Sequence, residues 1–316
     1  MKRTLVLALA LIAVLAGCSS STEAAPPAEA VTVKHKYGET KVPPDVSRVA
    51  TVGWNDQDFV LALGVVPVTT RAWFDNYNDF PWVKEATGGK GVPSAGRDGI
   101  DYEAIAAAQP QVILAIYETI DKPTYERLSA IAPTVVQSAD YPNEETPWDQ
   151  QLLLTAKALG KSTEAQALLD QVHAKIDEAK KANPVFAGKV LVEDYGPENG
   201  GHYLLGKGDP RRAVFDALGF GAQQVTKEVS DEKVALLDRD VLFVNGATKA
   251  QLAKSPVFSR LAVVRSDRTL YTSFESNLSG ALSYSGPKAL LYALDVLVPQ
   301  LANALNGKPV ADLSNA

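Results

Sequence analysis

One pattern occurs twice in this chain, about 130 residues apart, with a carboxylate at the same position each time. The first copy covers residues 103–115 and begins with Glu103, and the second covers residues 232–244 and begins with Glu232. Both copies share their apolar positions and the step from the acid to a valine, so each is predicted to form a short amphipathic helix, a tight turn and a buried strand. A repeat of this kind predicts two lobes of similar build with a cleft between them, each carrying a Glu at the same structural place.

Similarity on both sides of the two copies strengthens this interpretation. Residues 125–131 match residues 258–264 downstream, and residues 59–65 match residues 214–220 upstream. Each upstream segment has a glycine after its apolar run, Gly64 or Gly219, and glycine commonly ends a helix in the left-handed conformation. Any α/β protein offers one such match by chance, but three matches in the same order favour a true duplication.

The first residues have the pattern of an export signal. Lys2 and Arg3 precede an apolar run at residues 5–15, which is shorter than the roughly 20 residues of a membrane span. Small residues then lead to Cys18, the only cysteine in the chain, in a pattern that resembles the lipobox of bacterial lipoproteins. Residues 1–17 are therefore expected to be a lipoprotein signal peptide; the alternative is an ordinary signal peptide followed by a lone buried cysteine.

A polar segment follows the cysteine. Residues 18–30 are rich in Ser, Ala and Pro and are expected to be a flexible tether, lipidated at Cys18. The resemblance implies an extracytoplasmic protein, lipid-anchored to the outer face of the cell membrane.

Composition excludes several classes of partner. The net charge is −6 and becomes −8 once Lys2 and Arg3 are removed with the signal peptide, and an acidic surface argues against nucleic acid as a partner. A single cysteine allows no internal disulfide. About 300 mature residues suffice for two domains with proper cores, and we expect a monomer.

Strands alternate with helices in both halves, which predicts mainly parallel sheets covered on both faces. The first lobe, residues 31–147, should contain an opening hairpin that turns near Tyr37. Its remaining elements are expected to be strands at residues 48–52, 65–69, 112–116 and 134–137 and a helix at residues 56–63.

Residues 148–183 are expected to connect the lobes. One helix should cover residues 148–159, and a second should begin with a capping box at residues 163–166 and continue to about Lys181. Six apolar residues on one face should pack this second helix along the protein: Ala165, Leu168, Leu169, Val172, Ile176 and Ala179. The second lobe, residues 184–316, should open with a strand at residues 189–193 and end with a helix at residues 287–305. The predicted fold class is therefore α/β, with two Rossmann-like lobes joined by one long helix, and such a connection predicts a stiff hinge with little closure.

Seven segments, taken in order, resemble a known family: residues 48–54, 62–67, 110–114, 131–135, 255–258, 268–271 and 291–299. They look like the periplasmic-binding-protein family for ferric siderophores, haem and cobalamin, and the chain is similar to the iron-siderophore substrate-binding lipoproteins of Gram-positive bacteria. The resemblance covers nearly the whole mature chain. It implies a protein of this periplasmic-binding-protein-like fold that captures a ferric siderophore and delivers it to an ABC transporter permease dimer.

The resemblance gives the repeated acids a role. In this family a surface Glu on each lobe docks onto basic pockets of the two permease subunits, and Glu103 and Glu232 stand at the matching positions. Two like charges, one on each lobe, would fix orientation on a two-fold partner and raise the encounter rate. The alternative is a solvated carboxylate that is stabilised by the dipole at the start of each helix.

Ligand residues are expected in loops at the carboxyl ends of the strands. The resemblance implies that Arg97 and Tyr117 hold the iron-coordinating oxygens of a hydroxamate, and an Arg fork and a Tyr hydroxyl are suitable hydrogen-bond donors for that task. The alternative for Arg97 is a surface ion pair with Asp98 or Asp101. Further candidates are Trp54, Trp73, Tyr195, Arg211, Arg212, Phe274 and Tyr284, together with the aromatic residues Phe74, Tyr77, Trp82 and Tyr203.

Rival functions differ in what they need. A free-metal site would need clustered ligands, but His35, His173 and His202 are scattered along the chain, so we expect no resident metal or cofactor and iron that arrives inside a chelator. Haem remains an alternative because Tyr117, Tyr195 or Tyr203 could ligate its iron, and cobalamin remains one because an aromatic pocket accepts a corrin. Hydroxamates are favoured over anionic catecholates because no basic cluster is evident, although Arg211 and Arg212 could reverse that preference.

Other classes of protein are less consistent with the sequence. The chain has no Gly-x-Ser-x-Gly elbow and no His-Glu-x-x-His motif, and the Gly206-Lys-Gly208 segment lacks the rest of a phosphate loop, so no catalytic residue is assigned. A lipid-anchored enzyme is a remote alternative. A lipid-anchored adhesin is another, but it would not need the duplicated Glu.

Overall fold

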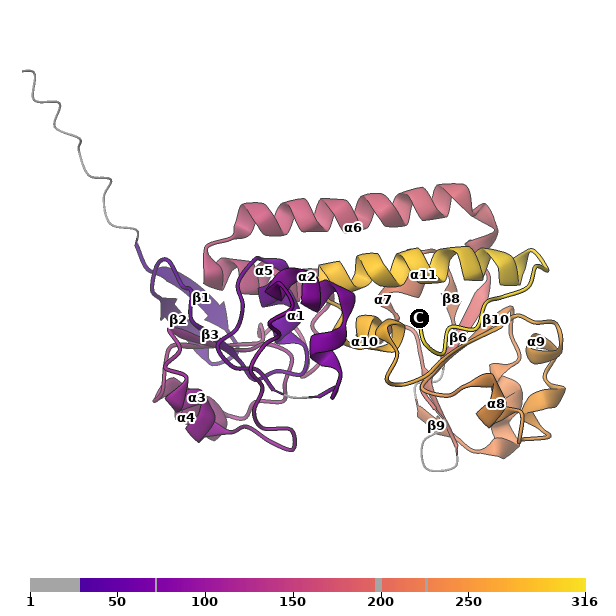
Figure 1. The fold of residues 1–316 in the computed structure, drawn as a ribbon, viewed down its shortest axis with the longest axis horizontal. Helices are drawn as coiled ribbons and strands as arrows, with labels where there is room; N and C mark the ends of the chain where they lie inside the picture. Colours follow the sequence, from indigo (N-terminus) through magenta and orange to yellow (C-terminus); the bar gives the residue numbers. More distant parts are fainter. Residues whose placement is uncertain (1–28, 72, 197–200, 225–226) are drawn as a thin grey trace, which may run out of the picture.

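The computed structural model describes residues 29–71, 73–196, 201–224 and 227–316, and the predicted signal peptide and Cys18 lie outside these residues. Two α/β lobes lie side by side, and a long helix runs past both of them (Figure 1). No helix in these ranges is long and apolar enough to cross a membrane.

The first lobe contains a small parallel sheet in the order β3-β4-β5, preceded by an antiparallel hairpin of β1 and β2. Every residue of β3, β4 and β5 is buried, as expected for a sheet covered on both faces. The strand predicted at residues 65–69 is wrong: only a single bridge joins Ala50 to Thr69, because Pro67 has no N–H group for a longer ladder. The strands are β1 (Val31–His35), β2 (Gly38–Val42), β3 (Val49–Thr51), β4 (Val112–Ala115) and β5 (Thr134–Val136).

Two helices of the first lobe, at residues 102–107 and 122–129, begin with a side-chain cap. The Asp101 carboxylate accepts a hydrogen bond from the Ala104 N–H at 2.9 Å, and the Asp121 carboxylate accepts one from the Thr124 N–H at 2.8 Å. The helices are α1 (Asp56–Ala62), α2 (Pro81–Thr87), α3 (Tyr102–Ala107) and α4 (Lys122–Ser129), with the 3-10 turn η1 (Tyr77–Asp79) before α2.

Two helices, α5 (Trp148–Leu159) and α6 (Ser162–Ala182), connect the lobes as predicted. Gly160 ends α5 in the left-handed conformation with a φ of 68°, and the six residues expected on one face of α6 are all buried. The predicted capping box is wrong, because α6 begins earlier, after Lys161, and no side chain caps its first N–H groups. The 3-10 turn η2 (Pro184–Phe186) follows α6.

The second lobe contains a mixed sheet in the order β11-β10-β6-β7-β9, with β8 also paired to β6. Strands β6, β10 and β11 are parallel, and on the other side of β6 the strand β7 is antiparallel to β6 and β9 is antiparallel to β7. The mainly parallel α/β architecture predicted from the sequence is confirmed. The strands are β6 (Val190–Asp194), β7 (His202–Leu205), β8 (Gly221–Ala222), β9 (Lys227–Val229), β10 (Val241–Asn245) and β11 (Thr269–Thr272).

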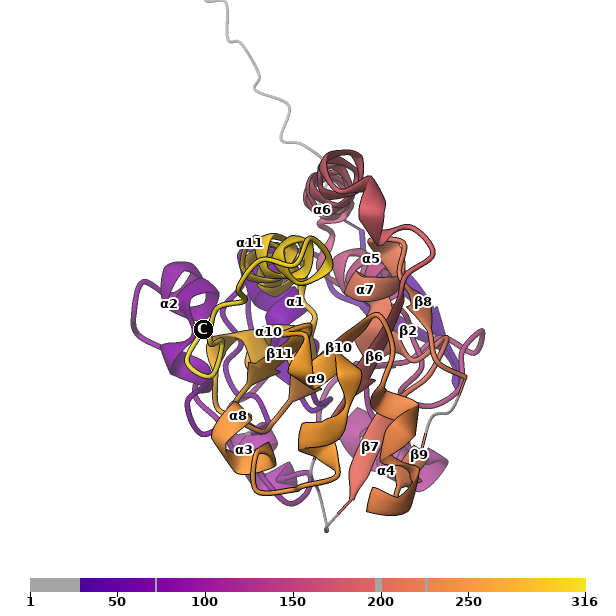
Figure 2. The ribbon, with the colours of Figure 1, turned by 90° about the vertical axis from the view of Figure 1, so that its right-hand side faces the viewer.

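Short helical segments join these strands, and one long helix, α11, ends the lobe and lies below α6 (Figure 2). The α-helices are α7 (Ala213–Ala217), α8 (Lys249–Leu252), α9 (Ala262–Arg265), α10 (Asn277–Tyr284) and α11 (Pro287–Leu305). The 3-10 segments are η3 (Pro210–Arg212), η4 (Asp231–Leu237) and η5 (Phe258–Arg260).

The sequence repeat is visible in the structure. Strands β4 and β10 each lie in the middle of three parallel strands, and Glu103 and Glu232 are each the second residue of the preceding helical segment, where both are exposed. The segment that begins at Asp231 is a 3-10 helix rather than the expected α-helix, and its buried residues Val234 and Leu237 follow the three-residue period of that helix. The match in sequence between residues 125–131 and 258–264 does not extend to the structure. The first copy lies largely in one helix, α4, whereas the second is divided between the segments η5 and α9.

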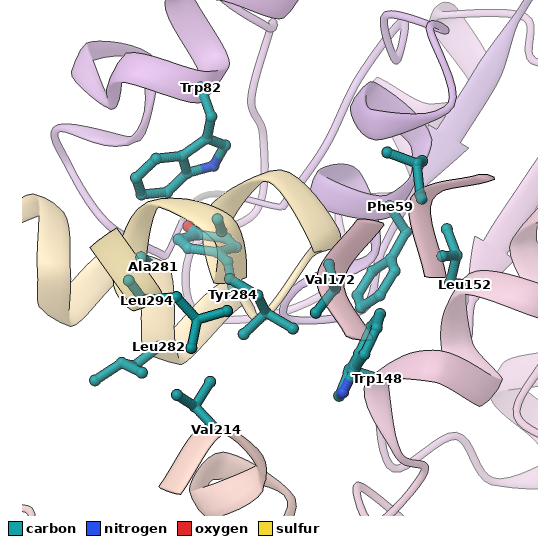
Figure 3. Packing of buried hydrophobic residues seen from close by; sticks show 14 of the residues in the cluster. Phe59, Trp82, Trp148, Leu152, Val172, Val214, Ala281, Leu282, Tyr284 and Leu294 are labelled. Carbon is teal, nitrogen blue, oxygen red and sulfur yellow. The ribbon is translucent and has the colours of Figure 1, made fainter. Parts of the chain in front are cut away.

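The lobes also meet at a second contact, which we call the lobe junction. It consists of Phe74, Tyr77, Phe80 and Trp82 of the first lobe with Phe274, α10, Gly286 and the start of α11 in the second. Tyr284, the last residue of α10, is fully buried there, with its ring centroid 4.6 Å from that of Tyr77. One cluster of buried apolar residues includes side chains of both lobes, among them Trp82, Tyr284 and Val214 (Figure 3). The lobes are therefore joined by this junction as well as by α6.

Candidate ligand-binding cleft

A cavity of about 1010 Å³ lies between the two lobes. This is at the upper end of the size range of small-molecule sites in proteins. Its first-lobe wall follows the carboxyl ends of the parallel strands, and its second-lobe wall lies mainly between β7 and α7. The wall residues are Trp54, Trp73, Tyr117, Glu118, Glu144 and Glu145 from the first lobe, and Tyr203, Lys207, Gly208, Asp209, Pro210 and Arg211 from the second.

A buried carboxylate holds the first-lobe wall in place. Asp56 accepts hydrogen bonds from the N–H groups of Gly53, Ile116 and Tyr117 at 3.0–3.1 Å, and so ties the ends of β3 and β4 together. Burial raises the pKa of Asp56 to about 6, although these three donors act in the opposite direction. Gly53 is required because a Cβ there would lie 2.4 Å from the Asp56 carboxylate. The Trp54 N–H also donates to the Tyr117 carbonyl at 3.0 Å, which fixes the two wall residues relative to each other.

Arg71 supports the aromatic part of this wall. Its guanidinium carbon lies 3.4 Å from the ring centroid of Trp54, and its Nη1 forms an ion pair with Glu118. Only 10% of the Arg71 side chain is exposed. Trp73 meets Trp54 edge to face, with 5.7 Å between the ring centroids. The two indoles therefore form one aromatic surface, and Arg71 packs behind it against Trp54.

Arg211 is held in place on the second-lobe wall by a neighbouring carboxylate. Its Nε and Nη2 donate to the two carboxylate oxygens of Asp209 at 2.9 and 2.8 Å. The guanidinium carbon of Arg211 also lies 5.4 Å from the ring centroid of Tyr195 and 5.6 Å from that of Tyr203. Tyr117 of the opposite wall is close enough for the charge of Arg211 to lower its pKa, but burial is the larger effect and raises that pKa, so the hydroxyl remains a hydrogen-bond donor.

Histidines do not contribute to the cavity wall. His202 pairs with Asp194 at 2.5 Å inside the second lobe, and His35 contacts Thr40 in the first hairpin. Within the described ranges, no three His, Cys, Asp or Glu side chains gather as a group that would hold a metal ion.

Comparison with known proteins gives this cleft its context. Residues 49–275 match the family described as periplasmic binding protein. The chain belongs to this family. It is 24% identical over 277 residues to the ferric-anguibactin-binding protein FatB of Vibrio anguillarum, covering 80% of this chain and 82% of FatB.

Solved structures of the same fold support the assignment. A periplasmic solute binding protein from Mycobacterium smegmatis is 31% identical with a TM-score of 0.81, covering 87% of this chain and 99% of that protein. PiaA of Streptococcus pneumoniae, an iron uptake ABC transporter substrate-binding protein, is 26% identical with a TM-score of 0.74, covering 88% of this chain and all of PiaA. The chain thus spans nearly the full length of these family members, whose common property is to bind a substrate.

The structure brings some of the expected ligand residues together at the cleft of this family member. Trp54, Trp73, Tyr117 and Arg211 line the cavity, as does Tyr203. Tyr195 stands next to the wall, where its ring contacts Arg211 and its hydroxyl lies 2.6 Å from the Ser283 hydroxyl.

Other expected residues lie elsewhere. Arg97 is half exposed outside the wall, where it pairs with Asp75 rather than with Asp98 or Asp101. Arg212 is fully buried behind the wall, 3.1 Å from Asp216, an ion pair that the four-residue spacing would have suggested. The remaining candidates belong to the lobe junction, where Tyr284 is buried and Phe274 stacks on Phe74: Phe74, Tyr77, Trp82, Phe274 and Tyr284.

Several wall residues were missed by the sequence analysis. Glu118 directly follows the predicted Tyr117, and Asp209 directly precedes the segment with Arg211, so proximity to a predicted residue was a usable signal for both. Arg71, which lies behind the wall against Trp54, begins the aromatic loop that contains Trp73, but its stacking is evident only in the structure. Nothing in the sequence indicated Glu144, Glu145 or Lys207.

Proposed function

We propose that this protein is the substrate-binding component of an ABC importer, which captures a ferric siderophore and delivers it to the membrane permease. The observation that carries the proposal is a cavity of about 1010 Å³ with an aromatic and Arg-containing wall, between the lobes of a periplasmic binding protein. The names of two relatives agree with it: FatB binds ferric anguibactin, and PiaA serves iron uptake and has also been solved with ferrichrome. The iron would arrive inside its chelator, so the protein needs no resident cofactor and performs no catalysis.

The charges of the second lobe support a hydroxamate as the preferred class. A highly anionic catecholate complex would need several uncompensated cations near the cleft. Arg211 is neutralised by Asp209, and Arg212 is buried beside Asp216, so neither supplies free positive charge to a ligand. A ferric hydroxamate, whose iron centre is neutral, needs only hydrogen-bond donors and apolar contact, which Tyr117, Arg211 and the two indoles supply.

Tryptophan fluorescence tests the proposal. Of the four tryptophans, Trp54 and Trp73 line the cavity, whereas Trp82 and Trp148 are buried elsewhere. We expect a ferric trihydroxamate to quench the soluble chain from Ser19 saturably at submicromolar concentration. The Trp54→Phe/Trp73→Phe variant should lose most of the quenching, while Trp148→Phe should keep it.

Parallel titrations with a ferric catecholate, a ferric carboxylate, haemin and cobalamin separate the alternatives. Saturation by haemin alone would move the assignment to haem, for which Tyr117 and Tyr203 on the cavity wall are candidate axial ligands. Saturation by none of these compounds would refute ligand capture at this cleft.

We further propose that Glu103 and Glu232 dock the loaded protein onto a two-fold permease. Both are exposed and stand at equivalent positions of the two lobes, which supports a contact with one copy of a basic pocket on each permease subunit. The Glu103→Ala/Glu232→Ala variant should bind the siderophore normally but lose most iron uptake in cells. An unchanged uptake rate would refute this role, and Glu39→Ala on the exposed edge of β2 is the matched control.

Membership of a periplasmic-type family supports an extracytoplasmic location, and we propose that lipid at Cys18 anchors the protein to the cell membrane. A Cys18→Ala variant should move from the membrane fraction to the soluble fraction. Retention of that variant at the membrane would contradict the lipid anchor.

A further inference from the structure

Charged side chains on the cavity walls are only partly compensated. Glu118 is paired with the buried Arg71, and Asp209 is paired with Arg211. The wall also carries Glu144 and Glu145 on the first lobe and Lys207 on the second. Among the described residues no ion pair involves these last three side chains.

The uncompensated charge is unevenly distributed between the lobes. The first-lobe wall holds three carboxylates, and Arg71 behind the wall neutralises Glu118, so an excess of two negative charges remains. The second-lobe wall holds Lys207 and Arg211 against Asp209, which leaves an excess of one positive charge. A ligand in the cavity therefore meets a negative surface on one side.

Glu144 lies close to the part of the wall that would touch a ligand. Its carboxylate accepts a hydrogen bond from the Thr119 hydroxyl at 2.8 Å, which holds the Glu144 side chain against the loop between β4 and α4. Its charge acts on the pKa of both Tyr117 and Glu118, which places it beside the predicted hydrogen-bond donor of the cleft. The side chain is half-buried, so water screens its charge less than it screens that of a fully exposed carboxylate.

We infer that the cleft prefers ferric hydroxamates that carry a free ammonium group, with that ammonium lying against Glu144 and Glu145. The inference rests on the proposed siderophore function and adds the charge of the ligand to it. The aromatic wall of Trp54 and Trp73 would contact the chelate itself. The two carboxylates would contact only its cationic arm, so they set selectivity rather than iron recognition.

A pair of chelates with the same iron centre tests this inference. Ferrioxamine B is a ferric trihydroxamate with one primary ammonium group, and its N-acetyl derivative lacks that charge. Calorimetric titration of the unaltered protein at low ionic strength should give about tenfold tighter binding of the charged chelate, a ratio that corresponds to one favourable ion contact in a partly screened site. The ratio should decrease as salt is added.

The variant Glu144→Gln/Glu145→Gln keeps the size of both side chains and an oxygen at position 144 that can accept from Thr119, but removes both charges. In this variant the ratio between the two chelates should fall to about twofold or less. Glu39→Gln, which removes one charge from an exposed residue of the β1–β2 hairpin, should leave the ratio unchanged.

Each outcome separates this inference from the function on which it rests. Equal binding of both chelates by the unaltered protein would overturn the ammonium preference and leave siderophore capture standing. A preference that persists in the double Gln variant would overturn the role of Glu144 and Glu145. Failure of the protein to bind any ferric siderophore would overturn both the proposed function and this inference.

Discussion

Gly280 offers a direct test of the lobe junction. It lies in the middle of α10, and a Cβ atom there would come 2.2 Å from Cζ of Phe80, where ordinary contacts are 3.4–4 Å. The Phe80 ring is fully buried and stacks on Trp82 at 4.8 Å, so it has little room to move away. Gly280→Ala should therefore force α10 and the first lobe apart by about 1 Å, a movement of the size that close-packed interiors resist.

The magnitude follows from two opposing effects. Overpacking of a close-packed interior costs about 1–3 kcal/mol, and the severity of this overlap places it at the upper end. Alanine is favoured over glycine within a helix by about 1 kcal/mol, which offsets part of the cost. We expect the free energy of unfolding to fall by about 2 kcal/mol and Tm by about 5 °C.

Urea unfolding of the soluble chain, followed by tryptophan fluorescence, measures this change. Gly99→Ala is the matched control, because a Cβ at Gly99 meets no atom within 4 Å and its φ is not positive, so its stability should stay equal or rise slightly. If Gly280→Ala were as stable as Gly99→Ala, the close contact between α10 and Phe80 would not exist as described. The altered junction should also weaken siderophore binding, because it moves the second-lobe wall relative to the first.

Two further predictions concern buried charges. Burial raises the pKa of Asp58 to about 7 and that of Glu193 to about 8, so the folded chain holds these protons more tightly than the unfolded chain does. Their contribution to stability is complete below the ordinary carboxyl pKa and is lost progressively as the pH rises from there to the raised pKa of each group. For Asp58, urea unfolding should show a decrease of up to about 4 kcal/mol between about pH 4 and about pH 7, absent in Asp58→Asn, and equal pH profiles of the two proteins would contradict it. Arg71→Met removes the cation behind Trp54 and leaves Glu118 without its ion-pair partner, so we expect a loss of about 2–3 kcal/mol and a shifted Trp54 emission, whereas an unchanged emission spectrum would argue against the stacking.

Elements with a strong local pattern could be predicted from the sequence. The apolar face of α6 follows a helical period, and β4 and β10 are short runs of apolar residues. The local sequence alone therefore predicts each of these elements. The hairpin of β1 and β2 was also local, because its turn at Gly38 has a φ of 122° that few other residues adopt. The exception was residues 65–69, where apolar residues suggested a strand that Pro67 shortens to one bridge.

The candidate site was predictable only where position in the fold determines the role. Trp54 and Tyr117 follow buried parallel strands, and the carboxyl ends of these strands lie at the cleft. Arg97 and Tyr284 could not be placed in this way, because Asp75 and Phe74 decide their positions and these partners are remote in sequence. The sequence also could not indicate that Glu144 and Glu145 line the cavity, because they lie in an irregular loop that no periodicity identifies.

Contacts across the lobe junction also bear on how the chain folds. The Phe74 N–H donates to the Tyr284 hydroxyl at 3.4 Å, and these residues are 210 positions apart. Because the aromatic residues of the first lobe are covered only when α10 arrives, a fragment that ends after residue 147 would expose Phe74, Tyr77 and Phe80 to water. Such distant pairings slow folding and leave intermediates prone to association until the second lobe has been made. The two lobes therefore depend on each other for a complete apolar interior.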